Sequence, residues 1–124
     1  MKNNFINDCC FLVTSNSKKS YQKLSETYSA IEPPTWALLL AQSCRSVGFK
    51  TAIIDANAES LSDDDILERL IELNPKILCL TVYGQNVNAG TTNMVGAIQL
   101  ANLIKAKKII SPIIFVGSYI QALP

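Results

Sequence analysis

The feature that most constrains the fold is a set of four short, largely apolar runs separated by longer segments. They span residues 9–14, 51–55, 77–82 and 113–116. A strand with one face in water alternates apolar and polar residues, whereas a strand covered on both faces is apolar throughout. The sequence therefore predicts a parallel β-sheet with helices on both of its faces.

An amphipathic segment lies between the first two runs, after a long polar connection over residues 15–32. Its helix is predicted to begin at Pro33-Pro34, because the first helical position tolerates the missing N–H of proline. Gly48 is typical of the position just past a helix C-terminus. The predicted buried face consists of apolar residues at helical spacing, namely Trp36, Leu39, Leu40, Cys44 and Val47.

The second helix is predicted to begin after Ser62, with carboxylates at residues 63–65 in its first turn. Such an acidic triplet is also compatible with a metal site, but capping of free N–H groups at the positive end of the helix dipole explains it more simply. Asn74-Pro75 is predicted to end this helix. Its predicted buried stripe consists of Ile66, Leu67, Leu70 and Ile71.

A polar loop over residues 83–90 is predicted to precede the third helix, with Thr91 or Thr92 as its cap. The lysines near its end complement the negative end of the helix dipole. The predicted inner face of this helix consists of Val95, Ile98, Leu100, Ala101 and Ile104.

Right-handed connections between parallel strands leave few possible topologies. We predict a three-layer, Rossmann-like (flavodoxin-like) α/β domain with strand order 2-1-3-4, in which a fifth strand is missing. Residues 1–124 are predicted to form one domain, with a flexible segment at residues 1–8. The fourth strand would then be a bare apolar edge, which favours an edge-strand dimer or indicates a piece of a longer protein.

Composition excludes several classes of function. The sequence contains no histidine, which rules out a Ser-His-Asp triad and histidine metal ligands. Its four cysteines form no C-x-x-C pair, and we interpret them as small buried side chains rather than ligands of zinc or an iron–sulfur cluster.

A formal net charge of +1 gives no basis for binding nucleic acid or a membrane surface. No run approaches the roughly 18 apolar residues of a membrane span, and no signal peptide is evident, so a cytoplasmic location is expected.

Ligands of open α/β sheets bind beyond the carboxyl ends of the strands, where the strand order reverses. The predicted cofactor-binding residues at that edge are hydroxyls, amides and glycines: Ser15, Asn16 and Ser17 after the first strand, Thr81, Tyr83, Gly84, Gln85 and Asn86 after the third, and Gly117, Ser118 and Tyr119 after the fourth. Each is also an ordinary turn residue. Together they suit binding rather than acid–base chemistry, so we predict neither a catalytic residue nor a metal ligand.

The common nucleotide-binding loops are missing. Neither G-x-G-x-x-G nor G-x-x-x-x-G-K-[ST] occurs in the sequence. Asp55 ends the second predicted strand, where an acidic residue can hold a ribose, but without the glycine loop this indication is weak.

Residues 32–41 resemble the P-P-x-x-[LA] opening of the first helix in the N-terminal cobalamin-binding domains of radical S-adenosylmethionine enzymes. Residues 47–51 and 54–59 are similar to that family's G-H-x-V and I-D-A-x-A-E segments. The match continues in order through residues 62–66, 74–76, 100–105 and 116–119. The resemblance covers residues 32–124, and the order and spacing of its motifs are more specific than any one of them.

The resemblance implies that the lower face and the nucleotide tail of cobalamin (vitamin B12) bind against the strand ends. It also implies a downstream barrel, absent from this sequence, that holds an iron–sulfur cluster and S-adenosylmethionine and carries out the chemistry. The cluster motif C-x-x-x-C-x-x-C does not occur here. The chain then corresponds to an N-terminal binding domain, with cobalamin and the barrel as its partners.

One departure from the family pattern concerns cobalt. Classical cobalamin domains carry D-x-H-x-x-G after the first strand, and this sequence has no histidine. Cobalamin would therefore bind without a histidine ligand. The alternative is a non-catalytic interaction or scaffold domain that has lost cobalamin binding. A small stand-alone enzyme is the least favoured interpretation, because no nucleophile–base pair can be assembled.

Overall fold

Four parallel strands form one sheet in the order β2-β1-β3-β4, as predicted. The computed structural model describes residues 4–14, 32–83 and 87–122. The strands are β1 (Asn7–Val13), β2 (Thr51–Asp55), β3 (Pro75–Thr81) and β4 (Ile113–Val116). All three pairings between neighbouring strands are parallel. The predicted α/β fold class, with its strand order, is thereby confirmed.

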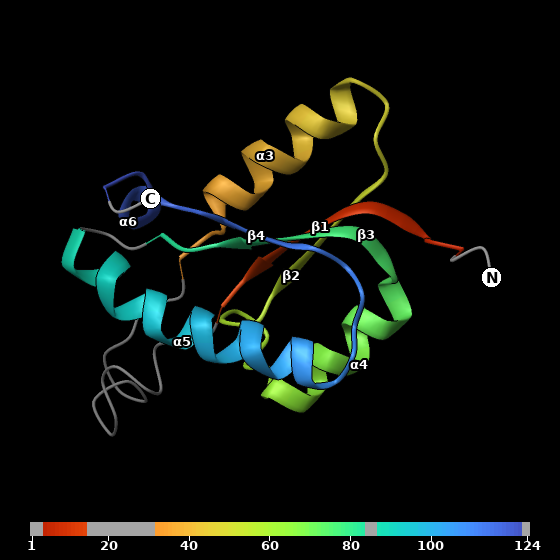
Figure 1. Cartoon of the computed structure of the whole chain (residues 1–124). Coiled ribbons are helices and arrows are strands. Elements are labelled where there is room, and N and C mark those ends of the chain that lie inside the picture. The colour runs from red at the N-terminus through yellow and green to blue at the C-terminus, as the bar shows by residue number, and fades with distance from the viewer. Residues whose placement is uncertain (1–3, 15–31, 84–86, 123–124) are drawn as a thin grey trace.

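Helices cover both faces of the sheet and make three layers (Figure 1). Helix α3 (Thr35–Ser46) lies on one face, and helices α4 (Asp63–Leu73) and α5 (Val87–Ala106) lie on the other. The short helix α6 (Ser118–Ala122) follows β4 and contacts α5. Since every crossover connects parallel strands, each helix begins near the edge of the sheet where the strands end.

The larger core lies between the sheet and helices α4 and α5. Alternate strand residues point into it, and the fully buried ones include Leu12, Ile54, Leu78 and Leu80. Helix α4 contributes Ile66, Leu67 and Leu70, as predicted, whereas Ile71 is exposed. Helix α5 contributes Ala97, Leu100, Ala101 and Ile104, whereas Val95 and Ile98 are exposed. The predicted faces of these two helices were therefore right in part.

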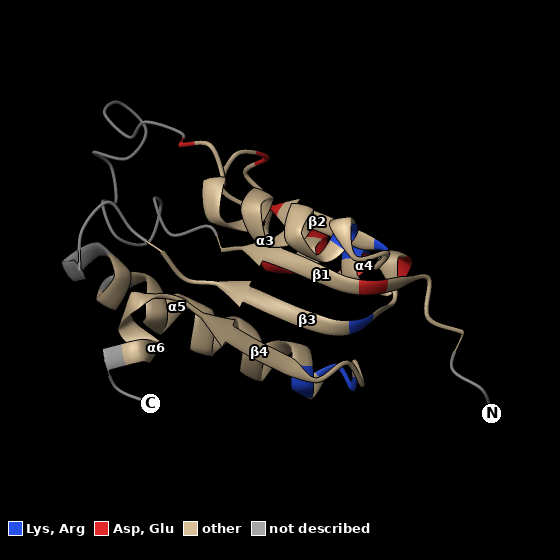
Figure 2. Cartoon of the chain, turned by 90° about the horizontal axis from the view of Figure 1, so that it is seen from above, with Lys and Arg blue, Asp and Glu red and all other residues tan. Residues whose placement is uncertain are grey.

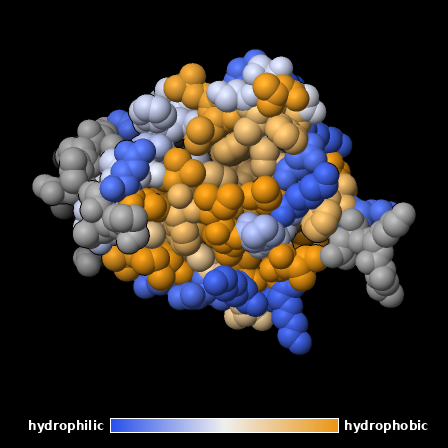
Figure 3. Space-filling model, turned by 45° about the horizontal axis from the view of Figure 1, so that its top comes forward, coloured by the Kyte–Doolittle hydropathy of each residue, from blue (hydrophilic) through white to orange (hydrophobic). Residues whose placement is uncertain are grey.

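The smaller core lies under α3, and its helical face differs from the prediction. Ala37 and Ala41 are buried against Phe11 and Cys79, with Leu40 and Cys44 packed beside them. The predicted residues Trp36, Leu39 and Val47 are exposed instead. Since α3 is the one long helix described on this face, only its narrow alanine stripe is buried. Large apolar side chains therefore remain on the outer surface around α3 (Figure 3).

Helix ends follow the predicted signals at both ends of α4 and at the end of α3, but not at the start of α5. Gly48 lies just past α3 with a φ of 96°, and its N–H donates to the Arg45 carbonyl at 3.0 Å. Ser62 caps α4 in a capping box, in which its hydroxyl accepts from the Asp65 N–H. Asn74 ends α4 in the left-handed conformation. Helix α5 begins at Val87, so Thr91 and Thr92 lie within it and are not its cap.

Strand β1 begins two residues earlier than predicted, within the segment predicted to be flexible. The buried side chain of Asn7 donates to the Leu73 carbonyl at 2.8 Å. The Asp8 carboxylate pairs with Lys76 at 2.8 Å and accepts the Lys50 N–H at 2.8 Å. Asp8 therefore joins the amino-terminal ends of β1, β2 and β3.

Candidate ligand site at the carboxyl ends of the strands

The carboxyl ends of the strands and the first turns of α3, α5 and α6 meet at one edge of the molecule, on the left of Figure 1. The chain passes from β1 to β2 over one face and from β2 to β3 over the other, so the strand order reverses between β1 and β3. This is the topological switch point at which open α/β sheets bind ligands. The structure thus confirms the strand order on which the predicted site edge rests, and the ligand site itself stays a prediction.

The predicted site residues are divided between described and undescribed parts of the chain. The residues in the described part are Thr81, Tyr83, Gly117, Ser118 and Tyr119. The residues outside the described part are Ser15, Asn16, Ser17, Gly84, Gln85 and Asn86.

Thr81 ties together the two strands that flank the switch point. Its side chain is buried, and its hydroxyl donates to the Leu12 carbonyl of β1 at 3.2 Å. The hydroxyl hydrogen is therefore engaged within the sheet. The bond links the ends of β1 and β3, so Thr81 contributes to the structure of this edge through the sheet.

Gly117 is a glycine because of packing between two strand ends. A Cβ atom at this buried position would lie 2.1 Å from the Val82 carbonyl oxygen. The Val82 N–H also donates to the Val116 carbonyl at 2.7 Å, so the two backbones run in close contact. The close approach that glycine permits here is to Val82 rather than to a ligand.

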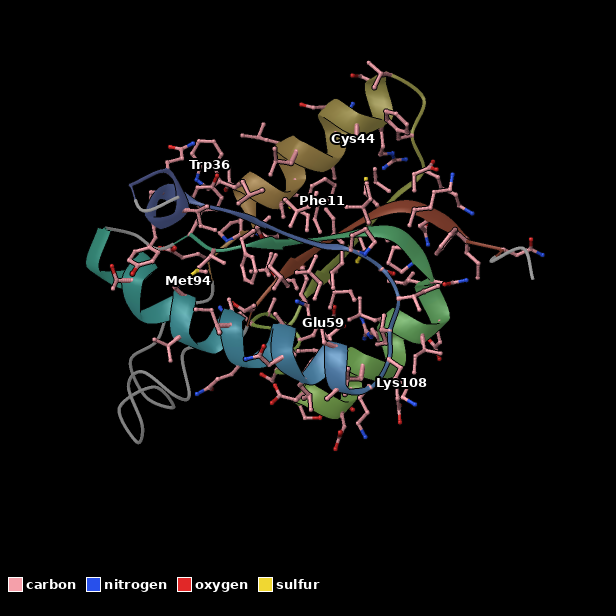
Figure 4. All side chains as sticks on the ribbon, in the orientation of Figure 1. Phe11, Trp36, Cys44, Glu59, Met94 and Lys108 are labelled. Atoms are coloured by element: carbon pink, nitrogen blue, oxygen red, sulfur yellow. The ribbon has the colours of Figure 1, made fainter. Side chains whose placement is uncertain are left out.

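Tyr83 and Trp36 form a stacked aromatic pair at the same edge. Their ring centroids lie 5.0 Å apart with an interplanar angle of 16°. Trp36 lies in the first turn of α3 (Figure 4) and is 53% exposed, whereas Tyr83 is partly buried. The Asn93 side chain of α5 donates to the Tyr83 carbonyl at 2.9 Å. Burial raises the pKa of Tyr83, with a smaller contribution from Cys79, so its phenol stays neutral at physiological pH.

Sequence reasoning missed Trp36 as a residue of this edge, because helical periodicity assigned it to the buried face. A signal was nevertheless present. The first turn of a helix that follows a parallel strand lies at the carboxyl edge of the sheet. Trp36 is the second residue of α3, so its position alone placed it near the site.

Ser118 and Tyr119 begin helix α6, beside the start of α5. Ser118 is exposed, and its hydroxyl oxygen lies 3.5 Å from the position that a Cβ atom on Gly90 would take. Tyr119 is partly buried. Ser118 is therefore an accessible hydroxyl at this edge, next to the first turns of α5.

The described residues that follow β1, β3 and β4 carry no charge at neutral pH. They are Thr14, Val82, Tyr83, Gly117, Ser118 and Tyr119. Figure 2 shows the charged residues of β1 and β3 at the opposite, amino-terminal ends of the strands. Asp55, at the end of β2, accepts the Ala58 N–H at 3.0 Å and closes a turn. This part of the site can hydrogen-bond and stack, but it has no pair of groups for acid–base catalysis.

The thiols of Cys9, Cys10 and Cys79 are protonated packing groups. Burial is the main cause that raises the pKa of Cys9 to about 11, of Cys10 to about 12 and of Cys79 to about 11. All four cysteines are free, and no group of three or more ligand-type side chains in the described segments is placed to hold a metal ion. Cys10 and Cys79 are buried and Cys9 and Cys44 are partly buried, which agrees with the prediction that the cysteines are small packed side chains.

A scan against protein-family models matched the B12-binding domain over residues 22–124. The chain belongs to the B12-binding domain family. Neither the curated proteins nor the solved structures gave a match. In the described segments, no helix has the length and apolar character needed to cross a membrane.

Membership of the B12-binding domain family agrees with the geometry of this edge. A B12-binding domain is a Rossmann-like binding module for cobalamin and is not catalytic by itself. The match begins between β1 and α3 and extends through β4, so it includes the ends of β3 and β4. The hydroxyl and aromatic groups described at this edge can hydrogen-bond to a ligand and stack against it.

Proposed function

We propose that this chain binds cobalamin at the carboxyl edge of its sheet and supplies no histidine ligand to cobalt. The observation that carries this proposal is the B12-binding domain match over residues 22–124, on a sheet whose switch point lies between β1 and β3. The missing histidine is a property of the whole sequence.

The described residues fit such a ligand chemically. Ser118 offers an exposed hydroxyl, and Trp36 and Tyr83 offer an aromatic surface at the same edge. The corrin of cobalamin carries amide side chains, which pair with hydroxyl and backbone groups. When bound, cobalamin supplies an alkyl–cobalt bond for methyl transfer or radical chemistry. We assign further contacts to Tyr119 and to residues outside the described part of the chain, namely Ser15, Asn16, Ser17, Gly84, Gln85 and Asn86.

We further propose that the chain serves a cytoplasmic radical S-adenosylmethionine enzyme as its cobalamin-binding domain. The ordered motifs between residues 32 and 124 support this parentage. The partner domain would be a barrel that holds an iron–sulfur cluster and S-adenosylmethionine. A C-x-x-x-C-x-x-C motif encoded downstream in the same gene is the expected result, and a gene without it would refute the parentage.

The test of binding is a titration of the purified chain with hydroxocobalamin and methylcobalamin, followed by visible absorbance and equilibrium dialysis. We expect saturable binding of one cobalamin per chain. Circular dichroism before and after the titration checks that the chain is folded. A folded chain that binds neither form would contradict the proposal and favour the alternative, an interaction or scaffold domain that has lost its ligand.

A further inference from the structure

The stacked pair of Trp36 and Tyr83 is held in place by three elements. Trp36 comes from α3 and Tyr83 from the end of β3, and Asn93 of α5 donates to the Tyr83 carbonyl at 2.9 Å. The residue before Tyr83 is fixed as well, because the Val82 N–H donates to the Val116 carbonyl at 2.7 Å. The backbone that carries the tyrosine ring is therefore held by β4 and α5, and the ring itself stacks on the indole.

Trp36 remains 53% exposed although Tyr83 stacks against it. Only one face of the indole can be covered by this stacked tyrosine. An exposed tryptophan leaves a large apolar surface in water, and a fixed aromatic surface of this kind suits a flat ring. Its position at the carboxyl edge of the sheet puts that surface where the topology directs a ligand.

We propose that Trp36, supported by Tyr83, is the stacking platform for the heteroaromatic base of the cobalamin nucleotide tail. This inference rests on the proposed function and adds the part of the ligand that the pair recognises. The corrin ring is puckered and carries methyl and amide groups on both faces, so it offers no flat surface for stacking. The base of the tail is a flat bicyclic ring, and aromatic stacking of a nucleotide base requires no matching hydrogen bonds.

A platform for the base makes this chain discriminate between corrinoids. Cobalamin carries the nucleotide tail, whereas cobinamide has the same corrin without it. Stacking of one base on one aromatic side chain is worth about 1–3 kcal/mol, which corresponds to between about fivefold and about 150-fold in affinity. We therefore expect the unmodified chain to bind cobalamin at least about fivefold more tightly than cobinamide.

The experiment measures the dissociation constants of cobalamin, cobinamide and the isolated nucleoside of 5,6-dimethylbenzimidazole by equilibrium dialysis. It compares the unmodified chain with Trp36→Leu, Trp36→Phe and Leu39→Ala. Leu39 is an exposed residue of the same helix and serves as the matched control. Trp36 is the only tryptophan in the sequence, so its near-ultraviolet circular dichroism reports directly on the pair when the nucleoside binds.

We expect Trp36→Leu to weaken cobalamin and nucleoside binding at least about fivefold and to leave cobinamide binding unchanged. Trp36→Phe should recover most of the loss, and Leu39→Ala should change none of the three constants. Equal weakening of cobalamin and cobinamide binding, or no effect on cobalamin binding, would overturn the inference. The stack of Trp36 on Tyr83 would then only connect α3 to the end of β3.

The nucleoside separates this inference from the proposed function. A chain that binds the nucleoside through Trp36 but does not bind cobalamin would refute the proposed function and keep only the stacking of a heteroaromatic base on Trp36. A chain that binds cobalamin independently of Trp36 would keep the function and refute the platform. A folded chain that binds none of the three compounds would overturn both.

Discussion

Gly117 and Gly90 are both buried near the strand ends, but a methyl group would meet different surroundings at the two positions. A Cβ atom on Gly117 would lie 2.1 Å from the Val82 carbonyl oxygen, so two backbone segments would have to separate. We expect Gly117→Ala to lower the free energy of unfolding by about 3 kcal/mol, the upper end of the range for overpacking. Urea unfolding followed by far-ultraviolet circular dichroism measures this change.

Gly90→Ala is the matched control for that substitution. The nearest atom to its Cβ would be the Ser118 hydroxyl oxygen at 3.5 Å, an ordinary contact, and Gly90 lies inside α5. Alanine should therefore raise the free energy of unfolding by about 0.5–1 kcal/mol, because glycine is the poorer helix former. Similar effects at both glycines would contradict the packing assigned to Gly117.

Asp8 gives the amino-terminal edge of the sheet a dependence on pH. The hydrogen bond from the Lys76 ammonium, followed by that from the Lys50 N–H, lowers the pKa of the Asp8 carboxyl below its ordinary value. A carboxyl whose pKa is lower in the folded state stabilises the fold fully above its unfolded pKa, and this contribution is lost as pH falls through the folded pKa. We expect Asp8→Asn to be less stable than the unmodified chain at about pH 7, and the difference to shrink below about pH 4.

Urea unfolding of both proteins over that pH range checks this expectation. The control is Glu72→Gln, which removes a negative charge from the last turn of α4. Negative charge is unfavourable at a helix C-terminus, so this variant should not lose stability at neutral pH. A stability difference for Asp8→Asn that grows toward acid would have the wrong sign.

The positions of the candidate site residues were predictable from the sequence only in part. The order of elements along the sequence is enough to place Thr81, Tyr83 and Ser118 at the carboxyl edge of the sheet. Their roles depend on contacts between residues far apart in sequence, such as the hydroxyl of Thr81 on Leu12. The ring stack of Trp36 and Tyr83 joins positions 47 residues apart (83 − 36), which no local pattern reveals.

Helix boundaries were easier to predict than helix faces. Caps depend on adjacent residues, and those at Gly48, Ser62 and Asn74 lie where the local chemistry indicates. Buried faces depend on what covers the sheet. Helix α3 has no other long helix described beside it on its face, so its flanks carry exposed apolar residues, and periodicity alone selected those flanks as core.

The end of α5 contains a local strain that can be relieved. Lys108 has a φ of 58°, and its N–H donates to the Lys105 carbonyl at 3.0 Å, while the Ile109 N–H donates to the Ile104 carbonyl. This is the geometry of a helix end at which glycine is preferred, because a side chain costs about 1 kcal/mol in the left-handed region. Lys108→Gly should therefore raise the free energy of unfolding by about 1 kcal/mol in urea.

Lys107→Gly is the control for this helix end. Lys107 is exposed and has no positive φ, so glycine there brings only added flexibility in the unfolded chain. It should lower the free energy of unfolding by about 0.5–1 kcal/mol. A gain in stability from both substitutions would indicate that lost positive charge, rather than relieved strain, is responsible.

At the scale of the whole molecule, the strand order was the most predictable property. Continuous apolar strands require cover on both faces, and right-handed crossovers restrict their order, so β2-β1-β3-β4 follows from rules that do not depend on side-chain detail. Those rules also place β4 at an edge of the sheet. They do not say what lies beside it, because pairing with another chain leaves no periodic pattern in this sequence.

We propose that β4 pairs with a second copy of the chain. The backbone groups on its outer side have no neighbouring strand within the described sheet, and Ile114 is 48% exposed on the face that carries α3. A strand edge with apolar side chains is a template for further pairing. We expect the chain to show a concentration-dependent monomer–dimer equilibrium by sedimentation velocity. Ile114→Lys should shift it toward monomer, because charged side chains on edge strands oppose such pairing.

Ile71→Lys makes the same chemical change at another exposed isoleucine, on α4. Its monomer–dimer equilibrium should match that of the unmodified chain, since net charge rises equally in the two variants and only the location differs. Equal loss of dimer in both variants would point to charge repulsion rather than to β4. An unmodified chain that stays monomeric across the whole concentration range would contradict the pairing.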